Sequence, residues 1–203
     1  MEPVRAAIIY YSATGTVHAL ATAAAEGAEK GGAEVRTRRV RELAPDSAID
    51  ANPAWGEHLR DTADIPEATP DDMAWADLAV FGTPTRFGGP ASQLAAFIDT
   101  LGPLWQEGRL ADKVYTAFTA SQTAHGGQEA TLLALSHVFH HWGGIIVPPG
   151  YTDPVQFESG NPYGASQVSG DGGSDDVAQA AARHQAQRAV TVTAALKLGR
   201  AAA

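Results

Sequence analysis

The 203-residue chain has no cysteine, few basic residues and no long apolar run. The absence of cysteine excludes disulfides, thiolate catalysis and thiolate-bound metal centres, and it is typical of a cytoplasmic protein. There are 14 Lys and Arg residues against 23 Asp and Glu, a net charge of −9. This balance argues against nucleic acid as the main partner, because phosphate backbones are bound by basic patches. No apolar run approaches ~18 residues and no signal pattern opens the chain, so we expect neither a membrane span nor export.

The residues that are present, 44% hydrophobic and 18% charged, are typical of a globular protein. We predict a single domain over residues 1–203, large enough for a substantial core. Two stretches interrupt the apolar pattern and are predicted as loop insertions. Residues 41–72 carry four prolines and are predicted to be mostly loop, with a short helical turn near Trp55. Residues 150–176 are rich in Gly, Pro, Ser and Asp and are too polar for a core layer.

Strand-like apolar segments alternate with helical segments along the chain. The predicted strands are residues 6–11, 33–40, 78–82, 113–119 and 145–148, and the predicted helices begin near residue 17 and cover 90–101, 128–142 and 177–198. The three central strands are apolar throughout, which is typical of a parallel sheet covered on both faces. We therefore predict an α/β fold, a three-layer sandwich whose five-stranded parallel sheet has the order 2-1-3-4-5 with helices on both faces.

Three loops rich in small residues follow the first, third and fourth predicted strands. We call them the first loop (residues 12–17), the second loop (83–88) and the third loop (120–127). These three strands are neighbours in a 2-1-3-4-5 sheet, and ligands of such sheets bind outside the carboxyl ends of the strands. The loops are therefore predicted to converge on one ligand site.

The first loop, within the sequence SATGT, has the composition of a phosphate cradle. Ser12, Thr14 and Thr16 offer hydroxyl groups, and the helix that follows adds free N–H groups and a partial positive charge. The sequence contains neither GxxxxGK[ST] nor GxGxxG here, which disfavours a P-loop NTPase and a standard dinucleotide-binding unit. Without Lys or Arg, the loop suits one phosphate monoester. The alternative is an ordinary helix start with a Ser or Thr N-cap.

Four segments together carry a closer match. They are SATGT, GTPTRFG at residues 82–88, GGQE at 126–129 and PYGA at 162–165. Together they resemble the WrbA family of flavodoxin-like, FMN-dependent NAD(P)H:quinone oxidoreductases, over about residues 4–198. The resemblance implies a flavodoxin-like fold and FMN as the cofactor. It also implies a homotetramer, a dimer of dimers, in which residues 150–176 pack near neighbouring subunits at the flavin sites.

The resemblance assigns roles to individual residues. The implied cofactor-binding residues are Ser12, Ala13, Thr14, Gly15, Thr16, Val17, Pro84, Thr85, Arg86, Phe87, Ala120, Ser121, Gln122, Thr123, Gly126, Gly127 and His141. Trp105, in a predicted loop, and Thr14 are the implied substrate contacts, and His141 is the implied catalytic residue, orienting the quinone or supplying a proton. Thr14 replaces an aromatic residue frequent in the family, and His125 is unusual for the third loop.

Several of these residues have an alternative interpretation. Arg86 is otherwise a surface salt-bridge residue, Phe87 an ordinary core residue and His125 an exposed side chain. His137 and His140 share helical spacing with His141, which is also the pattern of a metal site. No carboxylate stands at a suitable ligand spacing, so we predict no metal, and a polar helix face suits His137 and His140 better. Residues 150–176 are otherwise a mobile surface loop.

The predicted function is two-electron, ping-pong hydride transfer from NAD(P)H through N5 of FMN to a quinone, in a cytoplasmic enzyme. Its partners would be these small molecules, with no nucleic acid and no membrane. The alternative is a flavodoxin-type one-electron carrier that docks to a partner protein, which the −9 charge suits equally well. A third interpretation, a flavin-bound regulatory protein, finds no support in the sequence.

Overall fold

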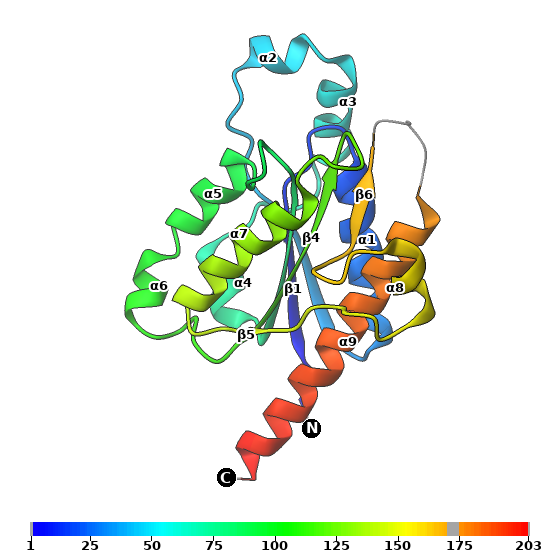
Figure 1. The fold of residues 1–203 in the computed structure, drawn as a ribbon. Helices are drawn as coiled ribbons and strands as arrows, with labels where there is room; N and C mark the ends of the chain where they lie inside the picture. The colour runs from blue at the N-terminus through cyan, green and yellow to red at the C-terminus, as the bar shows by residue number, and fades with distance from the viewer. Residues whose placement is uncertain (1, 170–174, 203) are drawn as a thin grey trace.

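The computed structural model describes residues 2–169 and 175–202. It is built on a parallel sheet of order β2-β1-β3-β4-β5, with β6 also paired to β4 (Figure 1). The strands are β1 (Arg5–Tyr10), β2 (Glu34–Arg39), β3 (Leu78–Pro84), β4 (Val114–Ser121), β5 (Ile145–Ile146) and β6 (Ser166–Val168). The predicted flavodoxin-like strand order is therefore confirmed, with an additional strand.

Helices cover both faces of the sheet, as predicted (Figure 1). The long helices α1 (Thr16–Lys30) and α9 (Asp176–Ala201) pack on one face. The other face is covered by α4 (Pro70–Trp75), α5 (Ser92–Asp99), α6 (Gly102–Gln106) and α7 (Gln128–His141). In β1, Ile8 contributes to the first core and Ile9 to the second, because successive side chains of a strand point to opposite faces. Among the described residues, no helix is long and apolar enough to cross a lipid bilayer.

The strand next to β4 is divided into two pieces. β5 pairs with Val114 and Tyr115 at the start of β4, and β6 pairs with residues 119–121 at its end. Between them the chain leaves the sheet and forms α8 (Pro154–Ser159). The sequence prediction of a four-residue fifth strand and of a region 150–176 too polar for the core is thus wrong. Residues 170–174 of that region lie outside the described part of the chain.

Gln185 of α9 fills the gap between β5 and β6. Its Nε2 donates to the carbonyl oxygen of Ala117 at 2.8 Å and to Thr116 Oγ1 at 2.6 Å, and its Oε1 accepts from the amide of Ala165 at 2.7 Å. The Gln185 side chain is fully buried. One amide side chain thereby satisfies backbone groups that an unbroken strand would otherwise pair.

Residues 41–72 contain helices where a loop was predicted. They form α2 (Asp46–Asp50), α3 (Pro53–Asp61) and the start of α4. Each begins with or follows a proline, and α4 also has a capping box between Thr69 and Asp72. Trp105, also predicted in a loop, lies in α6. Three of the four prolines that suggested loops, Pro45, Pro53 and Pro70, therefore mark helix starts.

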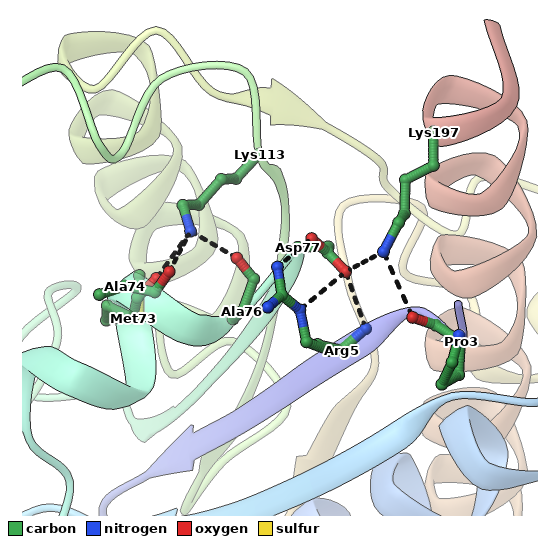
Figure 2. A network of polar contacts seen from close by, with 8 residues as sticks. All are labelled: Pro3, Arg5, Met73, Ala74, Ala76, Asp77, Lys113 and Lys197. Atoms are coloured by element: carbon green, nitrogen blue, oxygen red, sulfur yellow. Dashed lines mark hydrogen bonds and ion pairs between the residues drawn. The ribbon is translucent and has the colours of Figure 1, made fainter. Parts of the chain in front are cut away.

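A polar network closes the edge of the sheet at the amino ends of the strands (Figure 2). Asp77 accepts hydrogen bonds from Arg5 of β1 and Lys197 of α9. Burial alone would raise the pKa of Asp77, but these bonds outweigh it and hold the pKa at about 2. Lys113 donates to carbonyl oxygens at the end of α4, namely those of residues 73, 74 and 76. The network joins β1, β3, α4 and α9.

Candidate functional site

An open cleft of about 740 Å³ lies at the carboxyl ends of β1, β3 and β4. Its lining residues come from the three predicted loops and one further position. They are Ser12, Ala13, Thr14, Thr16, Val17, Pro84, Thr85, Arg86, Phe87, Ala120, Ser121, Gln122, Thr123, Gly126 and Ser169. All except Ser169 are among the residues predicted to contact the cofactor.

The first loop presents an uncapped helix N-terminus. The N-cap of α1 is Gly15, at φ +99°, with no side-chain cap and no acidic residue in the first turn. Ser12 Oγ accepts from the Gly15 amide at 3.1 Å and so closes the loop on itself. The N–H groups that open α1, beginning with Thr16, have no partner within the helix and suit an anion. The alternative of a Ser or Thr N-cap is wrong.

The second loop presents Phe87 to solvent at the edge of the cleft. Arg86 and Gly89 exchange backbone hydrogen bonds of 2.7 and 3.0 Å, and between them Phe87 takes φ +53°. This conformation costs a non-glycine residue about 1 kcal/mol. The Phe87 side chain is completely exposed, so it is not a core residue. Its strained backbone and unburied ring suit contact with a flat aromatic group.

Arg86 has no carboxylate partner in the described part of the chain. Its guanidinium donates to the carbonyl oxygen of Thr85 at 3.2 Å. The salt-bridge interpretation of Arg86 is therefore not supported. The exposed guanidinium lies at the cleft and is the one Lys or Arg side chain among the described residues that line it.

The third loop is stabilised by hydrogen bonds from Gln128, the first residue of α7. Gln128 Nε2 donates to the carbonyl oxygens of Thr123 at 3.1 Å and Ala124 at 3.2 Å. Ser169 donates its amide to the carbonyl oxygen of Ser121 at 2.7 Å and thereby attaches the chain after β6 to this loop. Sequence reasoning gave neither Gln128 nor Ser169 a role. The matched segment GGQE contained a signal for Gln128, but Ser169 lies in a polar region without a local signal.

Hydrogen bonds also join the second and third loops. The amide of Thr85 donates to the carbonyl oxygen of Ala120 at 2.8 Å, and Thr131 Oγ1 donates to Thr85 Oγ1 at 2.8 Å. Gly127 is the N-cap of α7 at φ +96°, and a Cβ there would lie 3.1 Å from the Cα of Gly88. Gly127, like Gly15, therefore shapes a loop without lining the cleft.

Tyr11, directly before the first loop, is fixed by a buried polar cluster. Its Oη donates to Glu42 Oε2 at 2.9 Å and accepts from Gln93 Nε2 at 3.0 Å. Trp55 of α3 donates to the same Glu42 oxygen at 3.0 Å. Burial, and then the hydrogen bond to Glu42, raise the pKa of Tyr11, so the phenol stays neutral. The cluster attaches residues 41–72 to the start of the first loop.

Trp105 and His141 lie together, away from the cleft of their own chain. Trp105 Nε1 donates to the carbonyl oxygen of His141 at 3.0 Å. His141 ends α7, which begins at the cleft beside Gly127 and whose 14 residues span about 21 Å. Figure 1 shows this end of α7 beside α6. His125 is exposed and does not line the cleft. Among the described residues, no group of three or more His, Cys, Asp or Glu side chains has the arrangement of a metal site.

Comparison with known proteins identifies relatives over nearly the whole chain. The model of the NADPH-dependent FMN reductase family matches residues 5–155. A protein from Deinococcus radiodurans named NAD(P)H dehydrogenase (quinone) is 50% identical over 195 residues, covering 96% of this chain and 98% of the relative. One of the same name from Sinorhizobium fredii is 40% identical, covering 93% and 96%.

Solved structures agree with these relatives. A WrbA-like flavodoxin from Agrobacterium tumefaciens matches with a TM-score of 0.66 and 25% identity, over 95% of this chain and 98% of that one. A flavodoxin from an archaeon matches with a TM-score of 0.57 at 15% identity, which supports the fold alone. The resemblance to WrbA proteins stated from the sequence is thus confirmed, and the chain belongs to the NADPH-dependent FMN reductase family.

Proposed function

We propose that this protein is an FMN-dependent NAD(P)H:quinone oxidoreductase. The observation that carries the proposal is one cleft with an uncapped helix N-terminus at its first loop and an exposed, strained Phe87 at its second. Relatives at 50% and 40% identity carry the name NAD(P)H dehydrogenase (quinone). The −9 charge and the absence of cysteine support small-molecule partners, without nucleic acid or membrane, in the cytoplasm.

The residues of the cleft fit FMN. Hydroxyl groups of Ser12, Thr14 and Thr16 and the free N–H groups of α1 suit a phosphate monoester. The backbone of the second loop and the ring of Phe87 suit a flat heteroaromatic ring. The third loop, which Gln128 holds in place, suits the chain that connects them.

When bound, FMN would supply the hydride chemistry that links NAD(P)H to the quinone. The three loops of the chain would bind the cofactor and orient its ring beside Phe87. The donor and the quinone are proposed to occupy the same exposed face in turn, beside Phe87 and Thr14. Among the described residues lining the cleft there is no Asp, Glu or His, so a proton for the reduced quinone comes from water or from another copy of the chain.

We further propose that a homotetramer completes the site, with His141 and Trp105 reaching the cleft of a second copy. Two observations support this arrangement. His141 ends α7, far from the cleft of the same chain, and Trp105 of α6 bonds to it with a side chain that is 55% exposed. The described residues of the segment 150–176, with the exposed rings of Tyr151 and Phe157, are proposed to pack near neighbouring subunits. The specific activity is then expected to fall on dilution, together with the loss of the tetramer in sedimentation.

The test is rapid mixing of the FMN-loaded protein with NADH or NADPH without oxygen, followed by benzoquinone. The flavin absorbance is expected to bleach with at least one nucleotide and to return with the quinone. Phe87→Ala is expected to slow both phases, whereas Leu198→Ala, which shortens an exposed side chain on α9, leaves them unchanged. If neither nucleotide bleaches the flavin, the oxidoreductase proposal is wrong and the carrier reduced by a partner protein replaces it.

A further inference from the structure

Three aromatic rings contact one another in a row beside the first loop. Tyr10 of β1 lies parallel to His18 of α1, with ring centroids 5.3 Å apart and an interplanar angle of 7°. His18 in turn contacts His58 of α3 at 5.3 Å and 49°. Both histidines are half-buried, and neither lines the cleft. The rings therefore connect residues 41–72 to the helix that opens the first loop.

His58 lies directly against that loop. Its Nδ1 is 3.6 Å from the point where a Cβ of Gly15 would be. His18 is the third residue of α1 and so belongs to the turn whose N–H groups suit an anion. The two imidazoles thus lie behind the proposed position of the phosphate, across the backbone of residues 15–18.

The first loop itself carries no Lys or Arg, and the guanidinium of Arg86 belongs to the second loop. The charged or titratable groups near the imidazoles are Tyr10, Arg39 and Asp61. Arg39 of β2 lines a small pocket together with Tyr10 and His58, and its guanidinium is paired with Glu67. Tyr10 stays neutral because burial raises its pKa to about 12, and Asp61 of α3 favours a charged His58. Burial lowers the pKa of both histidines, and repulsion from His18 lowers that of His58 further. Without an anion the pair is therefore held neutral near pH 7.

We propose that the His18–His58 pair takes up a proton from solvent when the FMN phosphate occupies the first loop, and so supplies the positive charge that the loop lacks. The inference rests on the proposed function, because it requires FMN. A dianion beside the pair favours the protonated imidazole, and the short distance between the rings limits the pair to one charge. His18 and His58 are positioning residues here, and FMN binding becomes linked to pH.

The test is calorimetric titration of FMN into the apoprotein at about pH 7, in two buffers of different ionisation enthalpy, which counts the protons taken up. Wild type is compared with His58→Asn and His18→Gln, and with His137→Asn, an exposed histidine of α7, as the matched control. Wild type and His137→Asn are expected to take up about half a proton more than the other two variants, which is the most that a rise of about one unit in a single pKa can give. The ionisation of the phosphate itself is common to all four and cancels.

Riboflavin, which lacks the phosphate, is expected to show no such difference. The affinity of wild type for FMN, relative to His58→Asn, is expected to rise up to about tenfold from about pH 8 to about pH 6, since a group whose pKa is higher in the complex favours binding at low pH. Equal proton uptake by wild type and both variants would overturn the inference and leave the proposed function intact. So would the same difference with riboflavin. Failure of wild type to bind FMN would overturn both.

A second measurement does not depend on the folding of the variants. The imidazole NMR signals of wild-type His18 and His58 are followed against pH, with and without FMN. A rise in the midpoint of one of them by about one pH unit with FMN supports the inference. Unchanged midpoints for both contradict it.

Discussion

Substitution of Gln185 is expected to cause a large loss in the free energy of unfolding, although Gln185 contacts no proposed ligand. Gln185→Met keeps the length of the side chain and removes its polar atoms. The carbonyl oxygen of Ala117 and the amide of Ala165 then lose their partner in a site where both residues are buried. Each unsatisfied buried backbone group costs about 1–3 kcal/mol.

The methionine recovers part of this cost by packing against the apolar neighbours of α9. The expected loss in the free energy of unfolding is therefore about 2–4 kcal/mol. Gln187→Met is the matched control, because Gln187 stands two residues further along α9 and is only partly buried. Its effect is expected to stay within about 0.5 kcal/mol.

The assay is urea unfolding of the apoprotein, followed by circular dichroism, with hydrogen exchange of the Ala165 amide as a local readout. Exchange of this amide is expected to accelerate in Gln185→Met and to stay slow in Gln187→Met. If both variants lose the same free energy, the explanation of the gap between β5 and β6 is refuted.

Three further predictions concern single positions. Phe87→Gly relieves a left-handed backbone and loses no burial, so the stability of the apoprotein should stay within about 1 kcal/mol while FMN binding weakens more than tenfold, as measured by fluorescence titration. Asp77→Asn should remove up to about 2 kcal/mol of stability at neutral pH. Because the pKa of Asp77 is depressed to about 2, wild type loses this contribution as the pH falls from about 4 to about 2. Acid unfolding of the variant should show no such loss. Gly27→Ala places a Cβ 2.1 Å from the carbonyl oxygen of Arg183 and should lower the free energy of unfolding by about 1–3 kcal/mol. Gly199→Ala, which has open space around it in α9, should raise the free energy of unfolding by about 0.5–1 kcal/mol. A stabilised Gly27→Ala would contradict the close contact of α1 with α9.

The central sheet and its loops were predictable because they depend on local signals. Apolar runs identified β1, β3 and β4, and the topology of parallel sheets then brought the first, second and third loops to one edge. The cleft is lined by these loops. The contacts of individual residues with FMN remain a prediction.

The elements that sequence reasoning missed depend on distant partners. β6 has only three residues. It forms because it pairs with β4 and because Gln185 accepts a hydrogen bond from the preceding Ala165, and neither contact leaves a local pattern in the sequence. In the same way, α3 is attached by the hydrogen bond from Trp55 to Glu42, and its one proline, Pro53, suggested a loop. The resemblance assigned His141 to the flavin and Trp105 to the substrate, but a sequence does not say which copy of a chain supplies a residue.

The division of the fifth strand also sets an order of events in folding. β1 and β2 pair after closing one short helical crossover, with Arg5 opposite Glu34. β4 and β6 pair only after a much longer segment has closed, with Thr119 opposite Ser166. Closure entropy grows with the length of the closed segment, and distant pairings form late. The edge of the sheet that Ser169 joins to the cleft is therefore expected to pair later than β1 with β2, so the third loop receives its support from Ser169 only after the opposite edge has formed.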